Sequence, residues 1–236
     1  PTWSEILKEI QEEIQKTQKP SIDKIRRKYL QALYEYTNRN VILYASSWTQ
    51  DKADISPRTI SITEEDIQGF MEVVHGLKGD ELDLILHSPG GSAEAVETIV
   101  DYLRKRFRYI RVIIPQGAMS AATMLACAAD EIVMGKHSYI GPIDSQIIIP
   151  TPLGLQSIPA QAILDQFEKA KEECQKDQKN LSIWLPILGQ YGPALLIQCQ
   201  NALNLSIELV SNFLQQYMFK DGDESRRKKA EEIAKR

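Results

Sequence analysis

The sequence predicts an α/β fold with a parallel-sheet core, an N-terminal helical hairpin and C-terminal helices. Short apolar, strand-like runs alternate with helical segments along the chain. Two of these runs, Leu82–Leu86 and Ile110–Ile114, each lead through a turn into a helix. Such alternation is typical of parallel strands joined by right-handed crossovers. The chain has 236 residues, 43% of them hydrophobic, so it can bury a substantial core in one large domain.

Two helices precede the first strand. Residues 2–19 form an amphipathic pattern that begins with capping-box spacing between Thr2 and Glu5, and Pro20 ends it. A second helix is expected from Ser21 to about Asn38. We interpret residues 1–39 either as a cover for the domain or as an oligomerisation arm. Because this arm carries more apolar helix surface than one core can cover, we expect a homo-oligomer.

The central segment, residues 40–219, is predicted to be one domain. Its first strand, 41–45, is expected to be buried on both faces, and residues 46–60 read as a loop. Further strands are expected at 82–87, 110–114 and 132–134, and helices at 63–75, 92–107 and 120–129. Residues 139–159 are rich in glycine and proline, which predicts turns and allows a hairpin. Helices at 160–179 and 193–219 follow, and the charged tail 220–236 is expected to fray.

Composition excludes several classes of function. The formal net charge of -4 does not favour nucleic-acid binding. Three widely spaced cysteines and three scattered histidines argue against a disulfide framework and a metal site, and we expect no cofactor. No run of about 18 apolar residues indicates a membrane span. The cysteine usage fits a reducing setting, so we expect a cytoplasmic protein. The N-terminus is charged and shows no signal-peptide pattern.

Two strand-to-helix turns carry the chemistry. The first reads Ser88-Pro89-Gly90-Gly91, in which glycines allow close approach by another backbone. The second is a glycine-led turn with Ser120 at the start of a helix of small residues. Taken singly, the first is an ordinary turn and Ser120 a helix cap. Taken together, at one edge of a parallel sheet, they offer a nucleophile and backbone N–H groups for an oxyanion hole.

These motifs resemble the Clp-protease/crotonase superfamily. The glycine turn is followed by Ala118-Met119-Ser120-Ala121 and then by the runs 129–134 and 138–143. Within the superfamily, the chain looks most like signal peptide peptidases and their soluble relatives, the serine dehydrogenase proteinases. The run 118–146 and the segment 26–30 favour a resemblance to the serine dehydrogenase proteinases. The resemblance implies a serine peptidase with Ser120 as nucleophile and the amides of Gly91 and Ala121 as oxyanion hole. It also implies a homo-oligomer that admits unfolded or extended peptides; an unfoldase partner is not identified. Gly90 and His87 are candidate substrate-binding residues.

The general base is missing from its expected places. Neither the histidine of the Clp proteolytic subunit nor the lysine of signal peptide peptidases has a counterpart at the corresponding segments, 141–145 and 155–162. Lys169, Lys171 and His137 remain as candidate bases, with Asp144 as a group that could polarise one of them. Acidic neighbours would raise the pKa of either lysine, which opposes a role as base. A partner subunit is a further possible source of the general base.

Three functions therefore compete. The first is a serine endopeptidase that forms an acyl-enzyme on Ser120. The second is a catalytically weak scaffold or peptide-binding assembly protein, motivated by the missing base. The third is an acyl-CoA hydratase-like enzyme, in which two backbone N–H groups would polarise a thioester. Ser120 in its turn, and the lack of an evident acidic pair, argue against the third.

Overall fold

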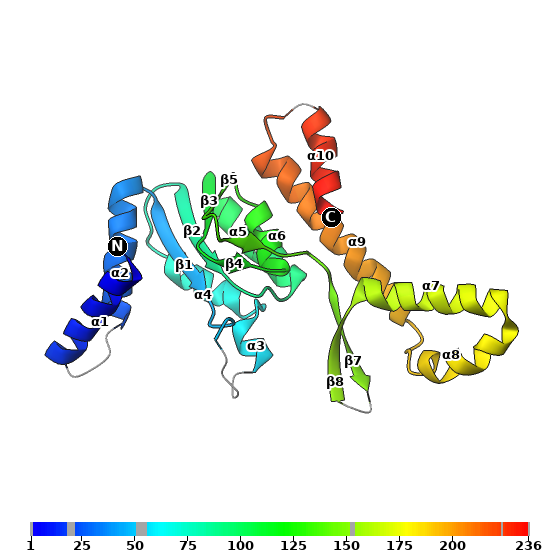
Figure 1. Cartoon of the computed structure of the whole chain (residues 1–236). Helices are drawn as coiled ribbons and strands as arrows, with labels where there is room; N and C mark the ends of the chain where they lie inside the picture. The colour runs from blue at the N-terminus through cyan, green and yellow to red at the C-terminus, as the bar shows by residue number, and fades with distance from the viewer. Residues whose placement is uncertain (1, 18–21, 51–55, 152–153, 223, 236) are drawn as a thin grey trace.

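A four-stranded parallel sheet in the order β1-β2-β3-β5 forms the centre of the molecule. The structure is a computed structural model that describes residues 2–17, 22–50, 56–151, 154–222 and 224–235. The strands of the sheet are β1 (Asn40–Ala45), β2 (Glu81–His87), β3 (Tyr109–Ile114) and β5 (Glu131–Met134). Parallel pairing throughout, with helices at the crossovers, confirms the predicted fold class (Figure 1).

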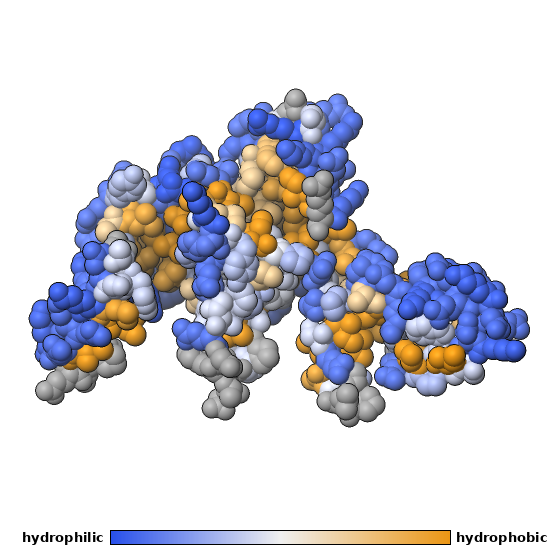
Figure 2. Space-filling view, viewed as in Figure 1, coloured by the Kyte–Doolittle hydropathy of each residue, from blue (hydrophilic) through white to orange (hydrophobic). Residues whose placement is uncertain are grey.

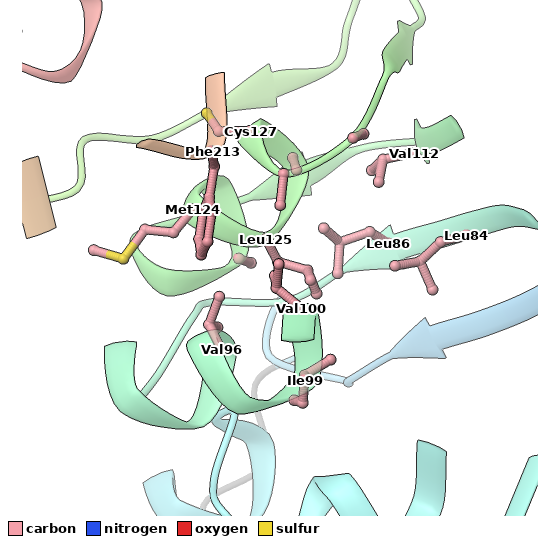
Figure 3. Close-up of a cluster of buried hydrophobic side chains, with 14 of the residues drawn as sticks. Leu84, Leu86, Val96, Ile99, Val100, Val112, Met124, Leu125, Cys127 and Phe213 are labelled. Atoms are coloured by element: carbon pink, nitrogen blue, oxygen red, sulfur yellow. The ribbon is translucent and has the colours of Figure 1, made fainter. Parts of the chain in front are cut away.

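Three helices pack on one face of this sheet. They are α4 (Asp66–Val74), α5 (Ala93–Arg106) and α6 (Ala121–Cys127). Figure 3 shows Val96, Ile99 and Val100 of α5 close to Leu84 and Leu86 of the sheet. These side chains are almost fully buried. The helix expected at 63–75 begins later, at Asp66, because the Asp66 carboxylate accepts the Thr63 amide and holds residues 63–65 in a turn (2.7 Å).

The other face of the sheet is only partly covered. Val41 and Leu43 of β1 are half-buried and Ala45 is exposed, so the expectation of a strand buried on both faces is wrong. The reason is that α4, α5 and α6 all pack on the opposite face. Asp83 is fully buried on the open face, where the Arg111 guanidinium forms a bidentate ion pair with its carboxylate (2.7 and 2.9 Å).

The N-terminal arm forms the expected helical hairpin. Its helices are α1 (Trp3–Thr17) and α2 (Ile22–Thr37), and the link between them lies outside the described residues. The capping box is confirmed, since Thr2 and Glu5 exchange hydrogen bonds in both directions (2.6 and 3.3 Å). None of the α1 side chains is buried, and the arm stands beside the edge of the sheet (Figure 1). Exposed apolar side chains of α1, such as Trp3, therefore remain open to a partner.

Residues 117–159 add short strands beside the sheet. Strands β4 (Gly117–Ala118) and β6 (Tyr139–Ile140) pair in parallel. Strands β7 (Gln146–Thr151) and β8 (Gly154–Pro159) form the antiparallel hairpin that the turn-rich sequence allows. The segment predicted as a loop at 46–60 contains one short helix, α3 (Pro57–Ile60), and residues 51–55 lie outside the described part.

The C-terminal third is helical. It comprises α7 (Ala160–Lys176), the 3-10 turn η1 (Gln178–Asn180), α8 (Leu181–Leu188), α9 (Leu195–Phe213), the π-helical turn η2 (Leu214–Met218) and α10 (Glu224–Ala234). The expectation that residues 220–236 fray is wrong for the described part of the tail. Ala230 and Ala234 of α10 are buried against the main core because small side chains let the charged helix approach α9.

Helix α9 belongs to two hydrophobic clusters. Its first half joins Ala160 and Ile163 of α7 in a small outer cluster through Leu195 and Cys199. Its second half enters the main core, where Phe213 lies beside Met124 and Cys127 of α6 (Figure 3). The middle of α9 therefore spans the space between the hairpin and the sheet.

Candidate active site

The two glycine-containing turns meet at the carboxyl edge of the sheet. Ser88 is fully buried and joins them, because its amide donates to Gly117 O and its carbonyl accepts from the amide of Met119 (3.3 and 3.0 Å). The Ser88 hydroxyl also accepts the Gly90 amide (3.1 Å). The glycine turn is thus fixed directly against the turn that carries Ser120.

Gly90 lies where no side chain fits. Its φ is +95°, and a Cβ at this position would come within 2.4 Å of Met119 O and 2.8 Å of both the Ser120 Cβ and the Ala121 nitrogen. Atoms this close cannot coexist without movement of the backbone. The requirement for glycine at this position is therefore steric, and it follows from the contact with Ser120.

Ser120 occupies a strained backbone conformation. Its φ of 50° and ψ of -121° place it in a region that residues with a Cβ rarely adopt. The interpretation of Ser120 as a helix cap fails, because its side chain makes no capping hydrogen bond to α6. Among the described residues, the hydroxyl has no hydrogen-bond partner. A sharp strand-to-helix turn that exposes a serine hydroxyl is the geometry of a nucleophile elbow.

The backbone amides of Gly91 and Ala121 are both available. Within the described part of the chain, neither amide makes a hydrogen bond. Ile62 binds the other side of the glycine turn, donating to Gly90 O and accepting from the Ser92 amide (2.7 and 2.9 Å). This pairing fixes Gly91, whose own N–H then faces away from Ile62.

Ser120 lines a cleft with a volume of about 740 Å³. One wall is the glycine turn and the start of α5. The other is the β7–β8 hairpin with the middle of α9. The second wall combines serine and glutamine side chains with apolar ones, which come from Ile147, Ile148, Leu155, Ala202 and Leu205. A cavity of this size, with apolar walls and a few polar groups, is typical of a ligand site.

The structure does not bring the candidate bases to this cleft. Lys171 is exposed on α7 and forms an ion pair with Glu168 (3.0 Å), and Lys169 lies on the same helix. His137 is exposed, with its Nε2 2.9 Å from Pro115 O. Asp144 is exposed next to the cleft-lining Ser145 but is not part of the lining.

His87 lies behind the glycine turn. Its Nδ1 is 3.1 Å from Gly117 O, and its ring packs against Trp48 with the centroids 5.5 Å apart. Like the candidate bases, it is absent from the lining of the cleft, whereas Gly90 is part of it.

Sequence reasoning missed several polar residues of the cleft. Ser145 and Ser206 both line it, and their hydroxyls lie 2.8 Å apart, with Ser145 also donating to Ala202 O (2.9 Å). These residues are about 60 positions apart, so only the packing of α9 against the hairpin brings them together. Within the described segments, no group of three or more His, Cys, Asp or Glu side chains could hold a metal ion.

Comparison with known families now adds to this geometry. The family model of the ClpP-like SDH-type serine proteinases matches residues 20–236. The chain belongs to this family. It thereby joins a family described as serine proteinases, and the motifs that carried the resemblance lie inside the matched region.

Curated relatives of this family member come from Methanocaldococcus jannaschii. The uncharacterized proteins MJ1495 and MJ0137 are 37% identical over 113 residues and 34% identical over 118 residues. These matches cover 48% and 50% of this chain but only 36% and 38% of the relatives. The chain therefore matches little more than a third of the length of these relatives.

A solved structure is also similar to this chain. The ClpP protease catalytic domain from Plasmodium falciparum has 14% sequence identity and a TM-score of 0.36, over 83% of this chain and 75% of that one. Separately, we find no helix among the described residues with the length and apolar character needed to cross a bilayer.

Proposed function

We propose that this chain is a serine endopeptidase in which Ser120 attacks the peptide carbonyl. The observation that carries the proposal is the strained, uncapped Ser120 held against Gly90 at the mouth of a cleft. Attack by the Ser120 Oγ forms a tetrahedral intermediate, whose oxyanion accepts hydrogen bonds from the amides of Gly91 and Ala121. Collapse releases the amine product and leaves an acyl-enzyme, which water then hydrolyses.

The hydroxyl of Ser120 must lose its proton to a general base during this attack. No lysine or histidine among the described residues lines the cleft. Lys169, Lys171 and His137 could serve only if an assembly brought one of them from a second copy to Ser120. We therefore propose that the active form is a homo-oligomer in which a partner subunit supplies the base.

Exposed apolar surface supports this assembly. Ile183 and Leu185 on α8 are 66% and 56% exposed, and Trp3 on α1 is 67% exposed. Helices that are apolar around their circumference are normally buried, and only Trp184 of α8 is buried within the chain. Light scattering should give a mass that is a multiple of 26.8 kDa. A mass equal to one chain at working concentration would contradict the assembly.

The second candidate function is a peptide-binding scaffold without hydrolysis. It is favoured by the same lack of a base in the cleft of a single chain. The scaffold would keep the cleft and the extended-peptide ligand but would not activate Ser120.

Labelling with a fluorophosphonate distinguishes the two functions. We expect the parent to be modified at Ser120, mapped by mass spectrometry, and Ser120→Ala to be unmodified. Ser157→Ala is the matched control, since Ser157 also lines the cleft and its loss should leave the labelling intact. Hydrolysis of an unfolded protein substrate should follow the same pattern. A folded parent that neither labels nor cleaves would favour the scaffold.

A further inference from the structure

Among the residues that the structure describes, one charged side chain lines the cleft, that of Glu94. All other lining residues are apolar, or are uncharged serines, glutamines and glycines. Glu94 lies in the first turn of α5, next to the glycine turn on which the proposed oxyanion hole is built. A cleft with one fixed charge does not treat cationic and neutral ligands alike, because opposite charges attract at short range.

Within the described part of the chain, the exposed Glu94 carboxylate shares its one protein hydrogen-bond donor, Ser92, with Glu64. The Ser92 Oγ lies 2.9 Å from Oε2 of Glu94 and 3.2 Å from Oε1 of Glu64, and it accepts the amide of Ala95 (3.0 Å). A serine hydroxyl has one hydrogen to donate. It can therefore serve only one of the two carboxylates, and the two negative charges converge on one oxygen atom.

No cationic side chain neutralises the pair within the described part of the chain. The nearby Arg58 forms its ion pair with Glu65 instead (3.0 Å). The N-terminus of α5 stabilises negative charge at this end of the helix, which explains why the carboxylates are tolerated there. Because Glu94 lines the cleft, a cationic group of a bound ligand would meet this carboxylate there.

We propose that Glu94 selects a lysine or arginine side chain of the bound peptide. The inference rests on the proposed function, in that the cleft holds an extended peptide next to Ser120. A basic side chain at the Glu94 end would supply the missing positive charge, while apolar side chains of the same peptide contact the hairpin and α9. The substrate class is thus an extended peptide with apolar residues and one basic residue.

Peptide binding tests this without relying on hydrolysis. The full chain carrying Ser120→Ala is titrated into fluorescein-labelled apolar octapeptides, with lysine or glutamine at each position in turn, and anisotropy gives the Kd. We expect one position at which the lysine peptide binds about threefold to fivefold more tightly. Adding Glu94→Gln should abolish this preference, and about 1 M salt should reduce it.

The matched control is Glu97→Gln. Glu97 is also exposed on α5, one turn further along, but it does not line the cleft. This variant should keep the lysine preference. The proposal is overturned if no octapeptide binds, if lysine and glutamine peptides bind equally at every position, if the preference survives Glu94→Gln, or if Glu97→Gln removes it equally. Absence of labelling at Ser120 would instead contradict hydrolysis alone, since this assay does not need it.

Discussion

One wall of the cleft is made of backbone and the other of side chains. On the first, a Cβ added at Gly90 would meet the turn that carries Ser120, and a Cβ added at Gly91 would meet the backbone of Ile62. On the second, the hairpin and α9 present long apolar side chains, two of which, Ile148 and Leu155, are 68% and 77% exposed. Figure 2 shows apolar surface on the projecting hairpin. The first wall therefore fixes the positions of Ser120 and the backbone amides, and it tolerates no larger residue at the glycines. Side chains of the second wall can be substituted without moving the first wall.

The largest effect is expected from a substitution in the backbone wall of the cleft. Gly90→Ala should destabilise the fold by about 3 kcal/mol, because the new Cβ meets Met119 O and the positive φ becomes strained. Labelling of Ser120 should fall by a factor of about 100 or more as the Ala121 amide is displaced. Labelling rates and urea denaturation measure both effects.

Gly69→Ala is the control for that substitution. Gly69 lies within α4, and a Cβ there would meet nothing within 4 Å. This variant should be more stable than the parent by up to about 1 kcal/mol, with unchanged labelling. Equal behaviour of the two variants would mean that the close contact at Gly90 has no consequence.

A second test removes ion pairs near the C-terminal end of α9, the helix that forms part of the side-chain wall. Asp130 is nearly buried and accepts from Arg104, from Lys220 just beyond η2, and from the Ile110 amide (2.7, 2.7 and 2.9 Å). Asp130→Asn should cost about 3 kcal/mol of unfolding free energy, because it removes the negative charge that pairs with the nearly buried Arg104 guanidinium. Labelling of Ser120 should change much less than in Gly90→Ala.

The same carboxylate gives a pH dependence. Burial raises the pKa of Asp130, but the hydrogen bonds from Lys220, Ile110 and Arg104 outweigh burial and hold that pKa below its usual value. A lowered pKa in the folded state stabilises the fold above the unfolded-state pKa, and this contribution is lost as the pH falls through the folded-state pKa. The stability difference between parent and Asp130→Asn should therefore narrow below about pH 4. A constant difference down to pH 2, by urea denaturation, would contradict this.

The smallest expected effect concerns the strain at Ser120. Because its φ is positive, Ser120→Gly should be more stable than Ser120→Ala by about 1 kcal/mol, although both lack the hydroxyl. Thermal unfolding of the two variants measures the difference. An alanine variant as stable as the glycine variant would show that the turn relaxes at no cost.

The backbone wall could be predicted from sequence far better than the side-chain wall. The glycine turn and Ser120 follow strands with clear apolar patterns, so their meeting at one sheet edge follows from parallel topology. Helix α8 was missed because its residues are apolar on all sides and include Pro186, which leaves no helical period to detect. Helix α10 was missed because its buried side chains, among those described, are two alanines in a highly charged segment, Ala230 and Ala234.

Helix α9 is anchored at both ends and contacts the cleft in the middle. Leu195 and Cys199 belong to the outer cluster, Leu209 and Phe213 to the main core, and Leu205 between them lines the cleft. A rod supported at two points resists bending at its centre, so the gap between α9 and the glycine turn is set when the two cores fold. For the proposed function, we therefore expect the cleft to keep a constant width, so that a single extended strand can enter it and a folded segment cannot.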